Sequence, residues 1–398
     1  MTDRADLLIC GGGIIGLTIA RELLIKGFEN IVVIEKEKDI GKHASGKNSG
    51  VLHAGIYYSQ DSLKAKFCLK GNLLMKEFCR EKKIPVFETG KVIVTKNEEE
   101  IPALKELQQR ALKNGTKADL IGEKELKTIE PYARTYQLAL FSPLTAVVDP
   151  LKIMESLEND LILTGKVRVL KGVEFKALKG NSEILTNAGN IRFDLFINSA
   201  GSYSDKVAHS FGTGMKYRVL PFKGTYKKLI KEKSHLVKGN IYQIPDTRNP
   251  FLGVHFTKTA DGTVYIGPTA IPALGRENYG VLKGIDREAL QIIYRDMVLF
   301  LRNDKFRNVA LTEPKKYTIN SVFQDVKDLV EGLHMEDIER SNKIGIRPQL
   351  VDWEKKELVM DFVILKHEKS IHILNAVSPG FTSSMAFAEF VVDKYIID

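Results

Sequence analysis

The chain has 398 residues, of which 43% are hydrophobic and 27% are charged. This composition is typical of a globular protein and excludes a disordered, collagen-like or disulfide-stapled chain. The net charge is +9, but the cations are mixed with acids along the whole chain and no recognition motif is present, so we expect no nucleic acid partner.

The three cysteines, Cys10, Cys68 and Cys79, are too few for a disulfide framework and lack zinc-ligand spacing. We therefore predict no metal site and a reducing, cytoplasmic location. No stretch approaches 18 consecutive apolar residues, so we expect no membrane-spanning helix. Peripheral contact with the inner face of a membrane stays open.

The N-terminus predicts a strand, a turn, a helix and a second strand. Residues 6–10 form a short apolar run that is typical of a buried parallel strand. Residues 11–16 match G-x-G-x-x-G, and residues 14–26 predict a helix. A second buried strand at residues 31–34 is closed by an acid, Glu35. This order is typical of a unit that binds a dinucleotide.

Each glycine of the turn has its own structural role. Gly11 allows the tight turn, Gly13 lets the backbone approach a pyrophosphate, and Gly16 lets helix and strand pack closely. At the start of the helix, Ile14 and Ile15 supply backbone N–H groups to the phosphates.

Glu35 follows the glycine turn by about 20 residues, where an acid accepts hydrogen bonds from ribose hydroxyls. The acid disfavours a 2′-phosphate, so NADP is not expected. We include its neighbour Lys36 in the predicted cofactor site. This segment alone does not distinguish FAD from NAD, and a glycine turn without a ligand is the structural alternative.

Small and polar residues follow the second strand closely. Ser45, Asn48 and Ser49 can offer hydroxyls, an amide and a helix N-terminus to a second phosphate, with Gly50 beside them. This cluster resembles the superfamily of D-amino-acid oxidase and glycerol-3-phosphate dehydrogenase. In those flavoproteins a Ser/Asn/Gly cluster at this place contacts the pyrophosphate and the flavin, so the resemblance implies FAD as the cofactor.

Further segments resemble the L-2-hydroxyglutarate oxidases and dehydrogenases within that superfamily. The similar segments are residues 43–58, 62–65, 221–226, 244–246, 250–257, 261–268 and 378–384. The last of them is similar to the family's C-terminal flavin loop, which implies flavin contacts for Gly380, Phe381 and Thr382. The resemblance implies oxidation of L-2-hydroxyglutarate to 2-oxoglutarate by hydride transfer to flavin N5.

Two later segments of the chain are predicted to belong to the nucleotide-binding domain as well. Asp149 and Pro150 predict a helix start, and a buried strand at residues 193–198 follows further on. In the superfamily, the backbone at Val173 holds adenine. The small residues Ala200 and Gly201 allow the flavin to approach closely.

Turn-punctuated, β-rich segments lie between these pieces, and Asp261 with Gly262 predicts a hairpin. We interpret them as an antiparallel sheet that covers the flavin, with helices outside. The predicted fold class is α/β (α+β overall), a Rossmann-type FAD-binding domain interleaved with a substrate domain built on that sheet. The FAD-binding domain takes residues 1–87, 149–217 and 343–398, and the substrate domain takes residues 88–148 and 218–342.

A hydroxyacid oxidoreductase must hold the substrate carboxylates, remove the hydroxyl proton and place the C–H bond against the flavin. His255 and His53 are the candidate bases, since histidine titrates near neutrality. A structural role is the alternative for His255, and flavin packing or covalent attachment for His53. Arg347 is the leading contact to a carboxylate or to the flavin carbonyl, with an interdomain salt bridge as the alternative. Weaker candidates for the distal carboxylate of a small dicarboxylate are Tyr58, Lys223, Arg276 and Thr382.

Two other functions stay open: an amine, amino-acid or glycerol-3-phosphate oxidoreductase of the same superfamily, and a flavin-bearing RNA-modification or redox-sensing module. Oxygen, a quinone and an electron-transfer protein are all compatible as electron acceptors. An amphipathic segment at residues 287–306 offers a face for a membrane or for a second copy of the chain in a homo-oligomer.

Overall fold

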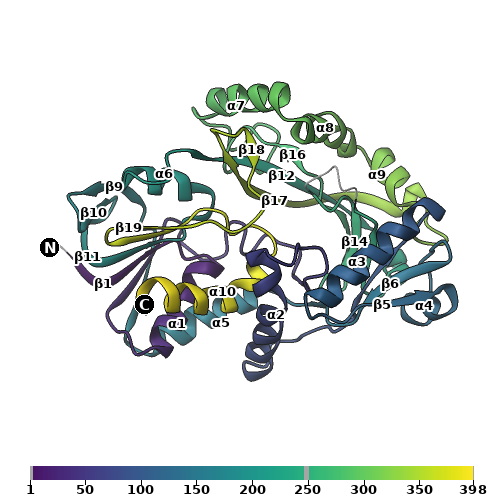
Figure 1. Ribbon diagram of the computed structural model, residues 1–398, viewed down its shortest axis with the longest axis horizontal. Coiled ribbons are helices and arrows are strands. Elements are labelled where there is room, and N and C mark those ends of the chain that lie inside the picture. The colour runs from purple at the N-terminus through teal and green to yellow at the C-terminus, as the bar shows by residue number, and fades with distance from the viewer. Residues whose placement is uncertain (1–2, 246–250, 398) are drawn as a thin grey trace.

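The structure is a computed structural model that describes residues 3–245 and 251–397. Two large β-sheets lie side by side and carry helices on their outer faces (Figure 1), and residues 51–52 pair with residues 146–147 in a small third sheet. Asp246 and Pro250, which belong to segments similar to the flavin superfamily, lie outside the described residues.

The elements follow one another in this order. The α-helices are α1 (Ile14–Ile25), α2 (Leu63–Glu81), α3 (Ile101–Lys113), α4 (Glu123–Ile129), α5 (Pro150–Leu163), α6 (Ser204–Ser210), α7 (Ala289–Arg302), α8 (Asp304–Thr312), α9 (Ile319–Val326) and α10 (Gly380–Val392). The strands are β1 (Asp3–Cys10), β2 (Ile31–Glu35), β3 (Val51–Leu52), β4 (Lys91–Val94), β5 (Asp119–Gly122), β6 (Leu138–Ser142), β7 (Ala146–Val147), β8 (Val167–Lys171), β9 (Phe175–Lys179), β10 (Glu183–Thr186), β11 (Gly189–Asn198), β12 (Tyr217–Leu229), β13 (Asn240–Gln243), β14 (His255–Lys258), β15 (Val264–Gly267), β16 (Ile271–Pro272), β17 (Ile338–Asp352), β18 (Glu357–Leu358), β19 (Ile364–His367) and β20 (Ser370–Ile373).

The first sheet has the order β19-β20-β11-β1-β2-β8, and its pairs from β20 to β8 are parallel. Strands from three distant parts of the chain therefore meet in one sheet. Because the carboxyl ends of parallel strands share an edge, the turn after β1 and the acid that ends β2 lie next to each other. This sheet confirms the predicted Rossmann-type unit.

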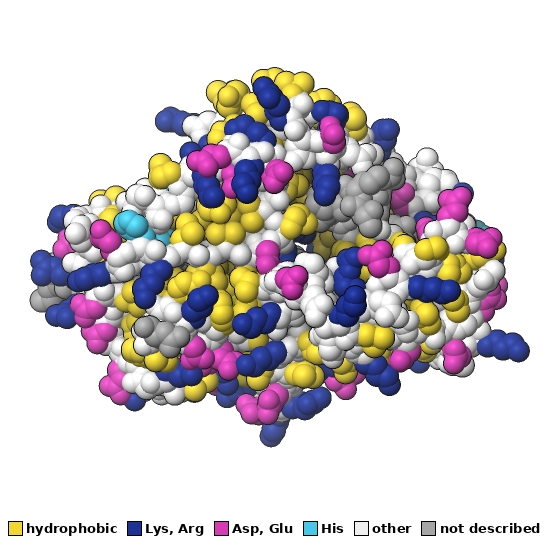
Figure 2. Space-filling model, in the orientation of Figure 1, with side chains coloured by type: hydrophobic (Ala, Val, Ile, Leu, Met, Phe, Trp, Pro, Cys, Tyr) yellow, Lys and Arg dark blue, Asp and Glu magenta, His cyan; other side chains and the backbone are white. Residues whose placement is uncertain are grey.

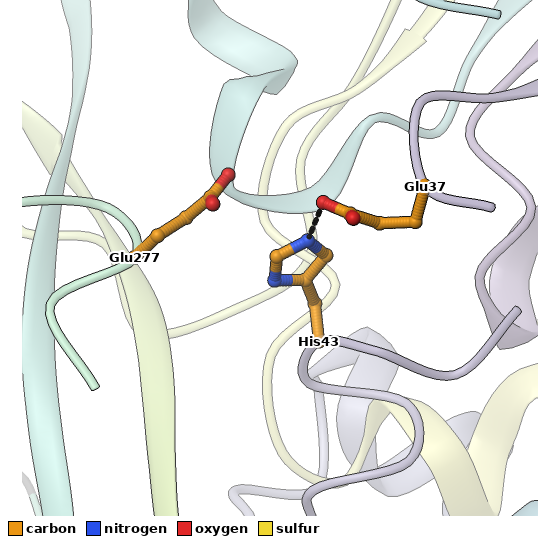
Figure 3. A group of neighbouring side chains, drawn as sticks. All are labelled: Glu37, His43 and Glu277. Atoms are coloured by element: carbon orange, nitrogen blue, oxygen red, sulfur yellow. Dashed lines mark hydrogen bonds and ion pairs between the residues drawn. The ribbon is translucent and has the colours of Figure 1, made fainter. Parts of the chain in front are cut away.

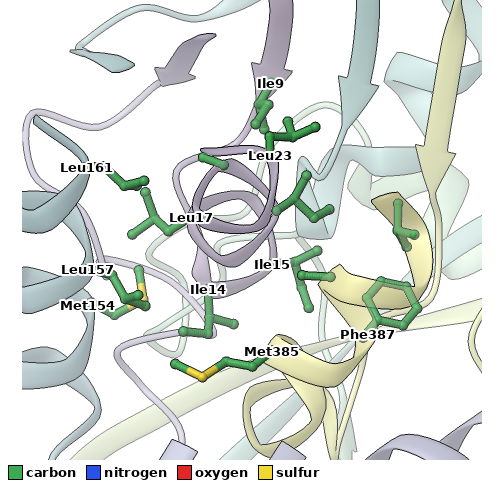
Figure 4. Packing of buried hydrophobic residues seen from close by; sticks show 14 of the residues in the cluster. Ile9, Ile14, Ile15, Leu17, Leu23, Met154, Leu157, Leu161, Met385 and Phe387 are labelled. Atoms are coloured by element: carbon green, nitrogen blue, oxygen red, sulfur yellow. The ribbon is translucent and has the colours of Figure 1, made fainter. Parts of the chain in front are cut away.

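Helices α1, α5 and α10 form one buried layer on this sheet (Figure 4). Leu17 and Leu23 of α1 pack with Leu157 of α5 and Phe387 of α10 in the largest apolar cluster. Burial of side chains this size contributes about 1.5–3 kcal/mol each. Since α10 also packs on α2, the last α-helix holds the first two in place.

The second sheet, which we call the roof sheet, has the order β18-β17-β12-β15-β14-β13-β4-β6-β5. Its pairs are antiparallel as predicted, except that β13 and β4 run parallel. The predicted hairpin at Asp261 and Gly262 joins β14 to β15, and Gly262 has φ +84°. Strand β14 begins at His255.

Strand β17 pairs with β12 along most of its length and belongs to the roof sheet. The predicted boundary between residues 342 and 343 therefore falls inside a strand and comes too early. The reason is that polar and apolar residues alternate irregularly along β17, and their pattern shows no break between residues 342 and 343. The other domain boundaries stay predictions.

Candidate active site

A cavity of about 820 Å³ is lined by residues of both sheets. Ligand sites usually measure about 300–1,000 Å³, so its size suits a large cofactor with a small substrate. The glycine turn, the end of β2, the segment around Ser45 and the start of α10 line one side, and residues of the roof sheet line the other.

The glycine turn has the geometry that its sequence predicts. Gly11 has φ +112°, and a Cβ there would lie 2.5 Å from the carbonyl oxygen of Ser199. A Cβ on Gly16 would lie 2.0 Å from the carbonyl oxygen of Gly11, so only glycine permits this packing of α1 on β1. A Cβ on Gly13 would meet only Ser45 Oγ, at 3.1 Å, and Gly13 lines the cavity. This open backbone is the cradle that a pyrophosphate requires.

Ser45 and Asn48 hold the loop beside the cradle. Ile14 N donates to Ser45 Oγ at 2.9 Å, while Asn48 donates to the Ser45 carbonyl and accepts from Gly50 N. Ser45, Asn48 and Ser49 line the cavity.

Gly16 and Gly50 do not belong to the cavity wall and act by shaping the backbone instead. A Cβ on Gly50, at φ +76°, would lie 2.4 Å from the carbonyl oxygen of Val148. The sequence places both glycines in the predicted cofactor site, and a direct contact of either with the cofactor stays a prediction.

The carboxylate of Glu35 lies at the mouth of the glycine turn and accepts from Gly12 N at 3.0 Å. Its backbone carbonyl accepts from Val173 N at 2.9 Å. Other predicted cofactor residues that line the same cavity are Ile15, Val173, Ala200, Gly201, Gly380, Phe381 and Thr382.

A charged cluster lines the cavity near Glu35, and Figure 3 shows three of its side chains, Glu37, His43 and Glu277. The ammonium of Lys36 pairs with Glu37 at 2.8 Å and also with Glu277, and His43 Nε2 lies 2.9 Å from Glu37 Oε1. Hydrogen bonds from Lys36 and His43 lower the pKa of Glu37 to about 2. Although ligand atoms of Glu37, His43 and Glu277 lie within 4.8 Å of one another, the ammonium of Lys36 already pairs with both carboxylates. We assign no metal to this cluster.

The two candidate bases both line the cavity. His255 stacks on Tyr242 with 3.7 Å between ring centroids, and its Nδ1 lies 2.9 Å from the Gly253 carbonyl oxygen. His53 Nδ1 is buried and has no hydrogen-bond partner among the described residues. Burial lowers the pKa of each histidine to about 3. Both rings are therefore neutral at pH 7 and able to accept a proton.

Arg347 also lines the cavity, and no carboxylate of residues 3–245 or 251–397 forms an ion pair with it. Its guanidinium carbon lies 4.8 Å from the ring centroid of Phe251, and its Nε donates to Gln349 Oε1 at 3.3 Å. Burial lowers the pKa of Arg347 to about 10, so the group stays charged at neutral pH. A desolvated cation that pairs with no carboxylate of the described residues fits a site for an anionic ligand.

Arg276 does not serve the cavity, so its predicted substrate contact is wrong. It is 1% exposed, and its guanidinium pairs with Asp205 at 2.6 Å and Glu288 at 2.7 Å. Lys223 likewise lies outside the wall and donates to the carbonyl oxygen of Gly280. Both cations already have partners that sequence spacing does not reveal.

The other two substrate candidates have different positions. Tyr58 lies beside Arg347 and Ser378 but is not part of the cavity wall. Thr382 lines the cavity, accepts from His53 N at 3.2 Å, and thus ties the start of α10 to the His53 segment.

Several wall residues were not predicted from the sequence. Lys47 lines the cavity and lies 4.3 Å from the ring centroid of Tyr279, and Tyr242 and His43 line it as well. The position of Lys47 inside the Ser45–Asn48 cluster was a usable signal. Nothing in the sequence shows that Tyr242 stacks on His255.

The fold and the cavity define a two-domain oxidoreductase that binds a dinucleotide cofactor. The chain belongs to the family of FAD dependent oxidoreductases (DAO), whose family model matches residues 6–394. The cofactor is FAD, and the open cradle at Gly13 with the carboxylate of Glu35 fits it.

The comparison with known proteins also gives full-length relatives. The mitochondrial L-2-hydroxyglutarate dehydrogenase of Homo sapiens is 35% identical, covering 99% of this chain and 89% of the relative. The L-2-hydroxyglutarate dehydrogenase of Indibacter alkaliphilus is 36% identical, covering 98% of both chains. Among solved structures, the FAD-bound L-alpha-glycerophosphate oxidase of Mycoplasma pneumoniae has a TM-score of 0.77 at 21% identity, covering 98% of this chain and 94% of that one. This last likeness concerns the fold.

Proposed function

We propose that the protein oxidises L-2-hydroxyglutarate to 2-oxoglutarate. The observation that carries the proposal is one cavity that joins the FAD cradle to two neutral histidines and to Arg347, a charged group with no carboxylate partner among the described residues. The full-length relatives named for this substrate support the choice among hydroxyacids.

In the proposed reaction, Arg347 binds one carboxylate of the substrate, and Lys47 is the cation available for the other. His255 or His53 takes the proton of the C2 hydroxyl. FAD supplies the acceptor for the hydride that leaves C2. Bound FAD and substrate would displace water from the cavity, which would strengthen each of these electrostatic contacts.

Anaerobic titration tests the proposal. L-2-hydroxyglutarate should bleach the flavin absorbance at about 450 nm much faster than its D-isomer does. Lactate should be at least about tenfold slower, because it lacks one carboxylate and one charge-assisted contact is worth about 1.5–3 kcal/mol. Equal rates with an amino acid or with glycerol 3-phosphate would move the protein to another branch of the family. Lack of bleaching with every compound would favour the redox-sensing or RNA-modification module.

We also propose that helix α7 docks on an anionic membrane, so that a membrane quinone is the electron acceptor. Its outer face carries Leu290, Ile293, Tyr294, Met297 and Leu301, which we call the α7 face. Leu290 is 78% exposed and Leu301 67%, and the spacing puts all five on one side of the helix.

The helix packs inward through other residues. Ile292 and Leu299 join an apolar cluster with Phe222 and Phe251, which also line the cavity. The α7 face therefore lies one layer behind the cavity wall. Figure 2 shows hydrophobic side chains gathered at the top of the molecule, over α7, beside basic ones.

Charge favours a lipid partner for this face. Exposed cations flank α7 in the sequence, namely Lys283, Arg287, Arg302 and Lys305, together with the exposed acids Asp286 and Asp304. Apolar side chains flanked by cations suit an anionic bilayer. No helix in the described part of the chain combines the length and hydropathy that a membrane span requires.

Vesicle flotation tests the docking. The protein should float with phosphatidylcholine vesicles that contain phosphatidylglycerol, and Leu290→Glu with Met297→Glu should weaken binding about tenfold or more. The control is Ile162→Glu with Leu163→Glu on α5, a second exposed apolar pair. A stable dimer that the α7 variant dissociates, without vesicle binding, would show that the face is a contact between copies.

A further inference from the structure

A lysine is buried beside Tyr242, the residue that stacks on the candidate base His255. Lys91 is the first residue of β4 and is 1% exposed. Its Nζ lies 4.4 Å from the ring centroid of Tyr57 and 4.8 Å from that of Tyr242, and it has no hydrogen-bond partner among the described residues.

An unpaired buried ammonium is costly, and a methionine of similar length would fill the same space without that cost. Another buried lysine of the chain offers a comparison. Lys76 on α2 is also buried, but its Nζ pairs with Glu88 at 2.9 Å. The absence of such a partner for Lys91 within the described ranges therefore needs a reason.

The ammonium is connected to the bases through one aromatic ring. The Nζ atom of Lys91 lies 4.8 Å from the ring centroid of Tyr242. The same ring stacks on His255, with 3.7 Å between the two ring centroids. His53 Nδ1 and the Tyr57 hydroxyl are further buried polar atoms without a partner in the part of the chain that the structure describes. Lys91, Tyr57 and Tyr242 thus form one sparsely bonded polar pocket that borders His255 through the ring of Tyr242.

The other titratable groups that face this pocket are uncharged. Cys68 of α2 donates from Sγ to the His53 carbonyl, and burial raises the pKa of its thiol to about 12. Burial also raises the pKa of Tyr57 and Tyr242 far above neutrality. No described carboxylate offsets the ammonium there, so its field acts on the histidines with little screening.

We propose that Lys91 sets the acid limit of proton transfer, because its buried ammonium opposes the uptake of a solvent proton by His255 and His53 before the substrate binds. The inference rests on the proposed function, in which one of these histidines is the base. Burial lowers the pKa of Lys91 to about 7. The ammonium is therefore charged below that pH, across the acid range in which an ordinary histidine takes up a proton.

The sign of the effect follows from these charges. Removal of the ammonium makes an imidazolium easier to form, so the histidine pKa rises toward its ordinary value. The base is then protonated at a higher pH, and the rate falls there. At high pH, where Lys91 is neutral, the variant and the native protein should react alike.

Lys91→Met tests this on the FAD-loaded protein. The acid limb of the anaerobic flavin-reduction rate should move up by about one pH unit, the size of effect expected for a neighbouring charge. NMR of histidine labelled with ¹⁵N should show the same upward shift in the imidazole titration. Lys91→Arg, which keeps the charge, should leave the acid limb in place.

Lys76→Met is the matched control, since it removes a buried ammonium from another part of the molecule and should not move the limb. An unmoved limb and unmoved histidine titration in Lys91→Met, while a histidine variant abolishes reduction, would refute the role of Lys91 alone. Native reduction rates in both His255→Ala and His53→Ala would instead refute the histidine base of the proposed function. If Lys91→Arg fails to fold, the NMR titration of Lys91→Met still decides.

Discussion

Burial sets the protonation state of the residues that line the cavity. The same desolvation that keeps His53 and His255 neutral leaves Arg347 charged, because their ordinary pKa values lie on opposite sides of neutrality. One apolar environment thus produces both a proton acceptor and a cation.

His255→Ala should lower the anaerobic flavin-reduction rate by about 10²–10⁴, the usual contribution of a positioned base. FAD content should not change, since His255 belongs to the roof sheet and not to the glycine turn. Stopped-flow absorbance measures the rate, with His53→Ala as the companion variant. Loss of reduction in His53→Ala with full activity in His255→Ala would reverse the assignment.

Arg347→Ala should raise the dissociation constant for 2-oxoglutarate by about tenfold to a hundredfold, because a charge-assisted contact is lost. Arg347→Lys should recover only part of the affinity, since lysine lacks the two-pronged donor geometry. Titration of the flavin spectrum with 2-oxoglutarate measures both. Native affinity in Arg347→Ala would remove this residue from the substrate site.

The contrast between two arginines shows how far the sequence predicts a site. Arg347 and Arg276 are both isolated cations in the sequence, yet one faces the cavity and the other is held by Asp205 and Glu288. Charge pairing between distant segments depends on the tertiary fold. For the same reason, the sequence did not indicate Lys91 behind Tyr242.

At the scale of elements, local signals predicted well. Helix α5 begins at Pro150, with Asp149 accepting from the N–H groups of Leu151 and Lys152, as the Asp-Pro pair predicts. Strand β2 ends at Glu35 as predicted. The parallel pairing of β4 with β13 was missed because pairing direction is set by chain topology and not by local pattern.

The junction of β1 and α1 gives a stability prediction. Gly16→Ala would place a Cβ 2.0 Å from the Gly11 carbonyl oxygen, so the helix must move. Overpacking of this kind costs about 1–3 kcal/mol, and thermal unfolding should occur several degrees lower with a loss of FAD content. Gly122→Ala at the start of α4 is the control, because a Cβ there meets nothing within 4 Å. Equal melting temperatures for the two variants would contradict the packing argument.

At the scale of the molecule, a buried ionic cluster ties the two sheets together. Arg276 and Glu288 belong to the roof part of the chain, and Asp205 belongs to α6 beside the parallel sheet. Burial alone would raise the pKa of Glu288, but hydrogen bonds from Arg276 and its attraction to Arg276 and Lys206 lower it to about 2. Removal of one member of such a cluster leaves a buried charge unpaired.

The lowered pKa of Glu288 makes stability depend on pH. Its contribution, on the order of 3 kcal/mol, is complete above the unfolded value of about 4.5 and is lost as pH falls from there toward 2. Glu288→Gln should therefore melt well below the native protein at pH 7, and the gap should shrink below pH 4.5. Calorimetry across that range measures the gap, and a constant gap would show that the Glu288 charge does not act.

The packing of α10 on α1 and α2 also has a consequence for how the protein is made. During synthesis the glycine turn leaves the ribosome long before Gly380–Val392 does. Until α10 has been made, the apolar faces of α1 and α2 that it covers stay exposed. During that interval the nascent chain depends on protection from aggregation. FAD capture should therefore be a late event in biosynthesis, and chains released before α10 should hold no flavin.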